Sequence, residues 1–386
     1  MADTRLAQLL LPPLSLYIHV PWCVEKCPYC DFNSHALRGQ IPELDYVQAL
    51  LNDLRADLHW VQGREIRSIF IGGGTPSLLS VAAVATLMQG IKDTVALSHD
   101  CEVTMEANPG TVEADKFAGF VAAGINRLSI GVQSLQSQQL NLLGRIHNPE
   151  QAIRAAQLAQ QLPLNSFNLD LMHGLPEQQL ATGLDDLQQT IQLAPPHLSW
   201  YQLTLEPNTP FYRQPPQLPS EDILEQINLQ GHQLLSDAGY QRYEISAYAK
   251  PGFECRHNLN YWTFGDYIGI GCGAHGKITQ PDLQRVIRSV KITAPAPYLA
   301  ADNYRLRVEP VATDELPFEY FMNRARLCQP APLEEFEQRT GLPLATIEAF
   351  LSKQQQQGTM RVDDVSWQMT ELGLNFFNQV IAPLSD

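Results

Sequence analysis

Residues 14–32 of the chain read LSLYIHVPWCVEKCPYCDF, a short apolar run followed at once by three closely spaced cysteines. The apolar run is rich in β-branched and aromatic residues and predicts a buried strand. The cysteines that follow it, Cys23, Cys27 and Cys30, have the spacing Cys-x3-Cys-x2-Cys. Because Pro28 opposes a continuous helix through this segment, we expect the cysteines to lie on a loop. Three thiolates on one loop can reach a single metal centre.

The cysteine loop fits two kinds of metal centre. A structural zinc ion needs four ligands, and His19 or His35 is the candidate for the fourth. An iron–sulfur cube of the ferredoxin type takes four thiolates, whereas only three lie close together in this sequence. The shortage favours a 4Fe–4S cluster with one iron open to another ligand, and zinc stays as the alternative.

Short β-rich runs alternate with longer helical patterns through the first two-thirds of the chain. This alternation predicts βαβ units and a parallel sheet. The six candidate strands are Leu16–Val20, Ser68–Gly72, Cys101–Met105, Arg127–Val132, Ser166–Met172 and His197–Leu203. Two of the helices show apolar positions at helical spacing. One carries Leu44, Val47, Leu51, Leu54 and Leu58 on one face, and the other carries Val81, Val84, Leu87, Met88 and Ile91.

Polar or glycine-rich residues stand at the carboxyl ends of these strands. The cysteine loop follows the first, the run GGGTP follows the second, and Glu106, Gln133 and Asp170 belong to the next three. The sixth offers Tyr201 and Gln202. Groups that converge from many strand ends are typical of the catalytic face of a β/α barrel. Six units rather than eight predict an α/β fold with a partial (βα)6 TIM-like barrel. An ordinary doubly wound sheet is the alternative.

The strand-end residues also suggest a ligand pocket. The glycines of Gly72–Pro76 let the backbone approach a ligand closely, and no Gly-Lys-Ser/Thr follows, so the run is not a phosphate loop. Arg145 can pair with a carboxylate, and Glu106, Gln133 and Asp170 fit the same pocket. A tight βα turn and solvated carboxylates are the plainer interpretations of these residues.

Composition limits the classes of function. The chain has 386 residues, 44 % of them hydrophobic, and a formal charge of −15 at pH 7. A chain with this negative charge lacks the excess of basic residues that nucleic-acid-binding proteins carry, and we expect no nucleic-acid partner.

The sequence also bears on location. No apolar run is long enough for a membrane span. Pro12 and Pro13 interrupt the apolar N-terminal stretch, which therefore makes a poor signal peptide. Seven cysteines are a poor disulfide framework, and we expect a cytoplasmic location.

The remainder of the chain changes in character. Residues 207–219 are Pro-rich, 221–238 look helical, and 250–276 read as an irregular, functional loop. From residue 311 short helices lead to a small β-wing at 360–370, which resembles a winged-helix module. Its five basic and eleven acidic residues disfavour binding to DNA. We therefore expect three parts: a barrel with the cluster loop at 1–220, a barrel extension at 221–310, and a C-terminal winged-helix-like domain at 311–386.

The cysteine spacing resembles that of the radical S-adenosylmethionine (SAM) superfamily. More narrowly, the segments YIHVPWCVEKCPYCDF, IGGGTPSLL, MEANPG, SIGVQS, LGRIH and NLDLMHGLP are similar to those of the oxygen-independent coproporphyrinogen III oxidase family. The resemblance runs over Tyr17–Gly276, and the C-terminal region is also family-like. It implies a 4Fe–4S cluster on the three cysteines and a SAM site. The implied SAM contacts are Tyr17, Gly73, Gly74, Thr75, Glu106, Gln133, Arg145 and Asp170.

Two features resemble the HemW-type heme chaperone subgroup of that family. Phe32 occupies the position of a fourth cysteine found in the oxidases, and HNLNYW at 257–262 matches the subgroup's His-Asn-x-x-Tyr-Trp motif. The resemblance implies heme binding and heme transfer to an acceptor, a respiratory and membrane-associated hemoprotein, with an electron donor as a further partner. Coproporphyrinogen oxidation is the alternative, and cleavage of SAM stays open. The implied heme contacts are His257, Asn258, Tyr261 and Trp262, with Cys255 as a second candidate ligand.

Overall fold

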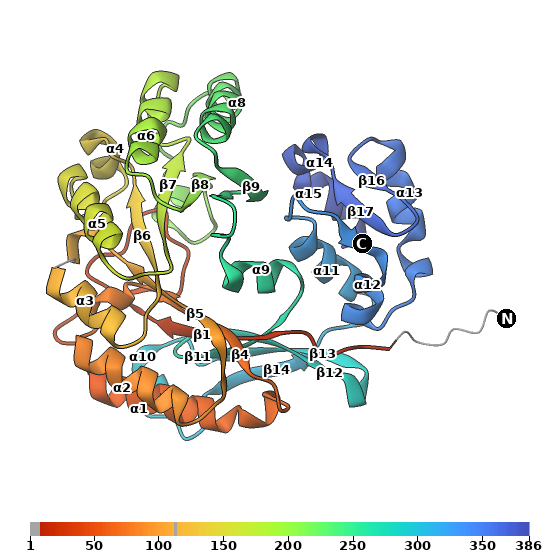
Figure 1. Ribbon diagram of the computed structural model, residues 1–386, viewed down its shortest axis with the longest axis horizontal. Coiled ribbons are helices and arrows are strands. Elements are labelled where there is room, and N and C mark those ends of the chain that lie inside the picture. The colour runs from red at the N-terminus through yellow and green to blue at the C-terminus, as the bar shows by residue number, and fades with distance from the viewer. Residues whose placement is uncertain (1–7, 112–113, 386) are drawn as a thin grey trace.

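The computed structural model describes residues 8–111 and 114–385, and the first seven residues of the N-terminal stretch discussed above lie outside it. Its central feature is a twelve-stranded sheet (Figure 1). Six parallel strands form the middle of that sheet in the order of the sequence. They are β1 (Leu14–Val20), β4 (Ile66–Gly73), β5 (Leu97–Ala107), β6 (Arg127–Gln133), β7 (Ser166–His173) and β8 (His197–Gln202). All six predicted strands are confirmed.

The strand order decides between the two predicted architectures. A doubly wound sheet reverses its strand order at a switch point, whereas here the six strands follow one another without reversal, as in a β/α barrel. The barrel stays open, because further strands continue the sheet at both sides. Beyond β8 lie β10 (Ala247–Ala249) and β9 (Gln241–Glu244), and beyond β1 lie β11 (Asp266–Ile270), β12 (His275–Gln280), β13 (Arg285–Lys291) and β14 (Arg305–Pro310). Strand β11 is parallel to β1, and the other added strands pair antiparallel with their neighbours.

Helices cover the outer face of the parallel strands (Figure 1). They are α1 (Glu43–Ala56), α2 (Val81–Lys92), α3 (Ala114–Ala122), α4 (Ser137–Leu142), α5 (Pro149–Gln161), α6 (Leu180–Gln192) and α8 (Glu221–Asp237). The short helix α7 (Pro210–Arg213) lies against the cysteine loop instead, where the Phe211 N–H donates to the Pro28 carbonyl over 3.0 Å. The start of α2 is set by Ser80, whose Oγ accepts a hydrogen bond from the Ala83 backbone N–H over 3.1 Å. Such a cap satisfies one of the free donors at a helix N-terminus.

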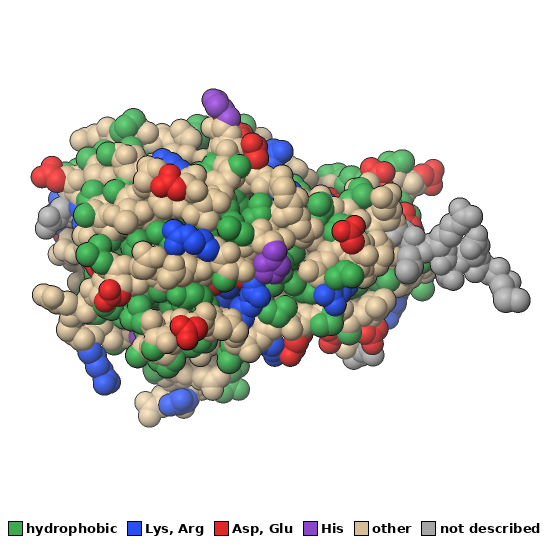
Figure 2. Space-filling view, turned by 90° about the horizontal axis from the view of Figure 1, so that it is seen from below, with side chains coloured by type: hydrophobic (Ala, Val, Ile, Leu, Met, Phe, Trp, Pro, Cys, Tyr) green, Lys and Arg blue, Asp and Glu red, His purple; other side chains and the backbone are tan. Residues whose placement is uncertain are grey.

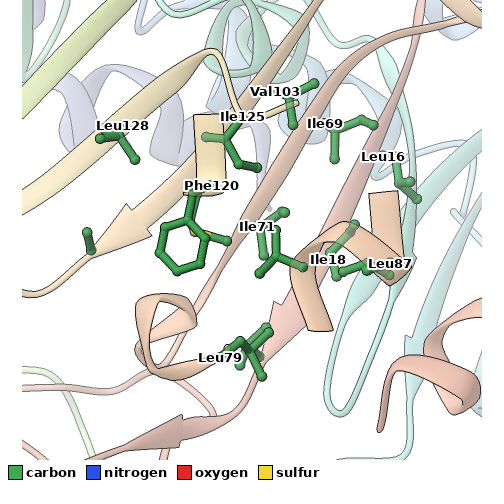
Figure 3. Close-up of a cluster of buried hydrophobic side chains, with 14 of the residues drawn as sticks. Leu16, Ile18, Ile69, Ile71, Leu79, Leu87, Val103, Phe120, Ile125 and Leu128 are labelled. Atoms are coloured by element: carbon green, nitrogen blue, oxygen red, sulfur yellow. The ribbon is translucent and has the colours of Figure 1, made fainter. Parts of the chain in front are cut away.

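The core lies between these helices and the sheet. Figure 3 shows Ile71 of β4 and Val103 of β5 close to Leu87 of α2 and Phe120 of α3, all of them buried. The prediction for α1 was wrong at its ends: the helix stops at Ala56, and Leu44 and Leu58 are 70 % and 38 % exposed. Leu44 belongs to the first turn of the helix, and Leu58 lies in a separate short 3-10 turn, Leu58–Trp60, after its end.

The segment 250–276 is not the irregular loop that we predicted. It contains α9 (Arg256–Trp262) and β11, whose five residues are all buried. Strand β11 pairs in parallel with β1, so the extension belongs to the same sheet as the barrel. The glycines that suggested a loop instead permit close packing: a Cβ at Gly269 would lie 1.9 Å from the His275 carbonyl oxygen.

The C-terminal part has its own buried cluster around Tyr320, Phe321, Phe336 and Trp367. Its helices are α11 (Leu316–Arg324), α12 (Leu333–Thr340), α13 (Glu348–Gln356), α14 (Glu371–Asn375) and α15 (Phe377–Ile381), and α10 (Pro295–Leu299) precedes them. A three-stranded sheet of β15 (Ala331–Pro332), β17 (Ser366–Met369) and β16 (Met360–Val362) accompanies the helices. The hairpin of β16 and β17 confirms the predicted wing.

Acidic and basic side chains are interspersed across the face of the molecule shown in Figure 2. Among the helices of the described residues, none combines the length and the hydropathy that a membrane span requires.

Candidate functional site

A cavity of about 480 Å³ opens at the carboxyl ends of the parallel strands and extends into the barrel. The loop after β1 supplies its mouth, and β4 to β8 each supply side chains to its wall. Ten of the eleven residues expected to bind the cluster or SAM line this one cavity. They are Cys23, Cys27, Cys30, Gly73, Gly74, Thr75, Glu106, Gln133, Arg145 and Asp170.

The three cysteines are free, partly buried thiols on a loop that starts where β1 ends. A turn closes the loop, with the Cys30 backbone N–H donating to the Cys27 carbonyl over 3.2 Å. Burial raises the pKa of Cys23, and its hydrogen bond to Thr75 acts in the opposite direction. Three thiols that face a common cavity fit a cluster held by three protein ligands.

A single zinc ion fits this loop poorly. Within 8–111 and 114–385, no three His, Cys, Asp or Glu side chains converge on one metal-ion position. His19 shares Nδ1 with the Tyr17 hydroxyl at 2.9 Å and Nε2 with the Asn33 carbonyl at 3.0 Å. Both of its ring nitrogens are therefore engaged. The His35 Nε2 lies 3.3 Å from the Asn33 Oδ1, a longer contact than either one that His19 makes.

Phe32 stands at the mouth of the cavity with 58 % of its surface exposed. Tyr29, by contrast, packs inside the loop with its ring 6.4 Å from that of Phe211. Burial raises the pKa of the Tyr29 hydroxyl well above its ordinary value, so this group stays neutral at physiological pH.

The glycine run forms the turn after β4 and packs directly under the cysteine loop. Gly73 has a φ of +111°, and a Cβ there would lie 2.4 Å from the His19 ring. A Cβ at Gly74 would lie 2.5 Å from the Trp22 carbonyl oxygen. The backbone N–H groups of Gly74 and Thr75 each donate over 2.7 Å, to the carbonyls of Val20 and Trp22. Only glycine permits this close approach of two backbones.

Two carboxyl groups face the cavity from β5 and β7. Glu106 accepts a hydrogen bond from the Gly73 N–H over 3.0 Å. Burial, with the charge of Asp170 beside it, raises the pKa of Glu106 to about 8. Asp170 accepts hydrogen bonds from Asn168 at 2.7 Å and Ser129 at 3.2 Å, and burial raises its pKa as well. A nearby positive charge favours the ionised form of a carboxyl group. These two neighbouring carboxyl groups, whose ionisation burial opposes, therefore suit a ligand that carries a positive charge.

Gln133 and Arg145 complete the rim. Gln133 has a φ of +65°, and its Oε1 accepts a hydrogen bond from the Tyr201 hydroxyl over 2.9 Å. Arg145 donates to the Gly131 carbonyl over 2.9 Å and to Cys27 Sγ over 3.5 Å. Its Nε is buried and has no hydrogen-bond partner among the described residues. A non-glycine residue at positive φ is strained, and the Gln133 side chain at this strained position lines the cavity.

Tyr17 is the exception among the expected SAM residues, because it does not line the cavity. Its ring stacks on Phe70, a cavity residue, with centroids 6.4 Å apart. Its hydroxyl holds the His19 ring that supports Gly73. The structure therefore places Tyr17 one layer behind the pocket.

The residues expected to contact heme lie on α9, which packs against β1, β4 and β11. His257 is 2 % exposed, its Nδ1 lies 3.0 Å from Ser68 Oγ, and burial lowers its pKa to about 3. Tyr261 packs on Tyr267 with ring centroids 4.1 Å apart, and Trp262 lies under the Arg326 guanidinium. Of the motif only Asn258 lines the cavity, together with Cys255.

Sequence reasoning missed much of the inner wall. Ser129 and Gly131 of β6, Asn168 of β7, and His197 and Ser199 of β8 line the cavity with the expected residues, whereas Tyr201 and Gln202 were among the expected strand-end residues and also line it. The two-residue period of a strand could have predicted these residues, because every second side chain of a strand faces the same side of the sheet. Asn168 stands two positions before Asp170, and His197 and Ser199 stand four and two positions before Tyr201.

Comparison with known proteins defines the class. The model of the radical SAM superfamily matches residues 17–187, and the HemN C-terminal domain matches residues 311–376. The solved structure of coproporphyrinogen III oxidase (HemN) from Escherichia coli, a radical SAM enzyme, superposes with a TM-score of 0.81 at 24 % identity. That match covers 98 % of this chain and 91 % of the other. The chain thus has the fold of a radical SAM protein, a class that uses a 4Fe–4S cluster and SAM.

Relatives define the family. The heme chaperone HemW of Escherichia coli (strain K12) is 58 % identical over 96 % of this chain and 98 % of its own length. HemW of Haemophilus influenzae is 54 % identical over 96 % of this chain and 97 % of its own length. A mitochondrial protein of Mus musculus, radical S-adenosyl methionine domain-containing protein 1, is 41 % identical over 68 % of this chain and 60 % of its own. The chain belongs to the HemW family, which confirms the resemblance inferred from its motifs.

Proposed function

We propose that this protein is a heme chaperone: it binds heme and transfers it to an acceptor hemoprotein, on a scaffold that holds a 4Fe–4S cluster and SAM. The observation that carries this proposal is the 58 % identity to a heme chaperone over nearly the whole of both chains. The proposed acceptor is a respiratory, membrane-associated hemoprotein, and the proposed place of action is the cytoplasm. Seven free thiols in the described residues suit a reducing compartment.

For the cofactors, we propose that Cys23, Cys27 and Cys30 hold the cluster. When bound, a cluster of this class supplies one electron for cleavage of the SAM sulfonium. The remaining cavity residues act by position: Glu106 and Asp170 offer carboxyl oxygens to the amino and hydroxyl groups of SAM, and Arg145 offers its free Nε–H to a carboxylate. Gly73, Gly74, Thr75 and Gln133 shape the pocket, and Tyr17 supports them through His19.

The oxidase alternative lacks support at the cysteine loop. Its fourth cysteine would stand where this chain has Phe32, and that ring is exposed rather than buried against the cavity. The likeness to HemN shows the fold alone. We therefore do not favour conversion of coproporphyrinogen as the activity of this chain.

We keep His257, Asn258, Tyr261 and Trp262 as proposed heme contacts. Because His257 is 2 % exposed and its ring lies 5.1 Å from that of Phe70, contact with heme requires α9 to separate from the barrel. The unpartnered Nε2 of His257 is then available to iron.

Anaerobic titration with heme tests the proposal. We expect a Soret band at one heme per chain, and loss of that band from the chaperone when an apo-hemoprotein acceptor is added, with and without SAM and a reductant as electron donor. Absence of heme binding, or conversion of coproporphyrinogen III by the cluster-loaded protein, would overturn it. Iron and sulfide should be present in the wild type and lost in Cys27→Ala.

A further inference from the structure

A chain of buried polar side chains runs through the inside of the barrel behind Asp170. It begins at Asn168, two positions before Asp170 on β7, and continues through His197 of β8 to Tyr243 of β9. Asn168, His197 and Tyr243 are 4 %, 1 % and 4 % exposed. Burial of polar groups is costly unless they are hydrogen-bonded, and these three side chains satisfy one another in sequence.

We propose that Asn168 and His197 are positioning residues for Asp170, which hold its carboxyl group in the orientation and the ionised form that a cationic, hydrogen-bond-donating ligand needs. This inference rests on the SAM site of the proposed function and deepens it. It concerns how one of the two carboxyl groups of that site is prepared for its ligand.

The Asn168 side chain makes every hydrogen bond that an amide can make. Its Nδ2 donates to Asp170 Oδ1 over 2.7 Å and to Ser129 Oγ over 2.8 Å. Its Oδ1 accepts from Ser199 Oγ over 3.1 Å and lies 2.7 Å from His197 Nδ1. Although Asn168 lines the cavity, its amide has no hydrogen bond left for a ligand. It therefore acts on a ligand through Asp170.

Both oxygens of the Asp170 carboxyl group are held by the protein. Oδ1 accepts from Asn168, and Oδ2 accepts from Ser129 over 3.2 Å. Donors on both oxygens fix the plane of the carboxyl group and leave further lone pairs for a ligand. Burial raises the pKa of Asp170, and the bonds from Asn168 and Ser129 lower it. The network thus favours the ionised carboxylate against the effect of burial.

His197 fixes which way the Asn168 amide points. The amide oxygen carries no hydrogen, so His197 Nδ1 must be the donor of that bond. Burial lowers the pKa of His197 well below its ordinary value, so the ring is neutral and its Nε2 is an acceptor. Since the amide oxygen is engaged by the histidine, the NH2 group of Asn168 is the part that faces Asp170.

Tyr243 anchors the chain at its inner end. Its hydroxyl lies 2.8 Å from His197 Nε2 and donates to it, because burial raises the pKa of the hydroxyl well above its ordinary value. Its oxygen accepts from the Cys255 backbone N–H over 3.4 Å. Every hydrogen bond from Cys255 to Asp170 therefore runs in one direction and ends on the carboxyl group. Bonds aligned in this way strengthen one another.

Three titratable side chains face Asp170 from neighbouring elements. They are Glu106 of β5, Arg145 after α4 and Tyr201 of β8. Tyr201 stays neutral because burial raises its pKa, and the Arg145 cation favours ionised Asp170. Glu106 titrates together with Asp170, so a Glu106→Gln background is needed to assign a pH midpoint to Asp170 rather than to the pair.

Equilibrium dialysis of SAM against the full, cluster-loaded protein tests the positioning role. Asn168→Leu has nearly the same shape and no donor. In the wild-type background we expect it to raise the dissociation constant of SAM roughly tenfold. In the Glu106→Gln background the midpoint of the pH dependence of SAM binding should rise by about one pH unit, because the carboxylate loses a donor. Asn165→Leu, on an exposed position before β7, is the matched control and should change neither quantity.

A pair of variants at His197 separates positioning from packing. His197→Leu removes the donor to the Asn168 oxygen and should raise the pH midpoint in the same direction. His197→Asn keeps an N–H at that place and should restore the midpoint. A role confined to packing would lower Tm in both variants and leave the midpoint unchanged. Thermal melting and iron content check that each variant is folded, and the His197 pair carries the test if Asn168→Leu does not fold.

The outcomes distinguish this inference from the proposed function. If the wild type binds no SAM, the proposed SAM site fails. If the wild type binds SAM and the pH midpoint is unchanged in both Asn168→Leu and His197→Leu, the positioning role is wrong and the proposed SAM site stands.

Discussion

Arg145 donates a hydrogen bond from Nη1 to the Sγ of Cys27 over 3.5 Å, across a separation of 118 residues in the chain. The same guanidinium donates from Nη2 to the Gly131 carbonyl of β6 over 2.9 Å. One side chain therefore joins the cysteine loop to the sheet. Since its Nε has no partner in the part of the chain that the structure describes, it also keeps a donor for a ligand in the cavity.

Replacing this arginine should weaken SAM binding. Arg145→Gln removes the charge, and hydrogen bonds to charged groups contribute about 1.5–3 kcal/mol. We expect the dissociation constant of SAM, measured by equilibrium dialysis of the reconstituted protein, to rise roughly 10- to 100-fold. Arg154→Gln, on an exposed position of α5, is the matched control. Equal affinities in the two variants would contradict the role of Arg145.

Glu106 should make the ligand-free protein less stable as the pH rises. Its pKa is about 8 in the folded chain against 4.5 as an ordinary carboxyl, so the folded state retains a proton that the unfolded state loses. Stability therefore falls as the pH rises through that interval. Glu106→Gln removes this contribution. We expect the fall in unfolding free energy between pH 6 and pH 8, measured in urea without SAM, to shrink by on the order of 1 kcal/mol.

A residual slope should remain in that variant, because the pKa of Asp170 is also raised by burial. SAM should bind more weakly to Glu106→Gln than to the wild type, since the cationic ligand loses a carboxyl group that can ionise beside it. A variant with the full wild-type pH slope would show that Glu106 is ionised in the folded protein.

Gly73 and Gly39 offer a comparison of two glycines at positive φ. A Cβ at Gly73 meets the His19 ring at 2.4 Å, whereas a Cβ at Gly39 has nothing within 4 Å. Gly39→Ala should therefore show only the backbone strain, about 1 kcal/mol. Gly73→Ala should add a steric cost of about 1–3 kcal/mol and reduce SAM binding, as measured by chemical denaturation and dialysis. Similar losses in both variants would remove the argument from close packing.

Phe32→Cys tests whether one thiol separates this chain from an oxidase. Phe32 is 58 % exposed, so we expect a change in stability of less than about 0.5 kcal/mol. We also expect no conversion of coproporphyrinogen III, followed by chromatography of the porphyrins, because the substrate pocket must differ elsewhere. Appearance of protoporphyrinogen IX in this variant would show that the missing thiol was the deciding difference.

Lys291 should be essential to the packing of α1 on the antiparallel extension. Its Nζ contacts Asp53 and also Asp57 at 2.7 Å, and all three side chains are fully buried. Lys291→Met leaves Asp53 without a cationic partner in the core, while Asp57 keeps its ion pair with Arg305, and breaking a buried pair costs about 3–5 kcal/mol. Calorimetry should show a large fall in Tm, whereas Lys353→Met, on an exposed position, should leave Tm unchanged.

The sequence by itself determined the six parallel strands, the loop with Cys23, Cys27 and Cys30, and the strand-end residues that share one cavity. These features follow from local patterns, because the period of a strand, the spacing of ligands and the turn after each strand are written within a few residues. Only the tertiary structure decided that α9 packs against β1, β4 and β11, and that His257 is enclosed there beside Ser68. These facts depend on which distant segments pack together, and burial against a distant segment leaves no regular period in the chain.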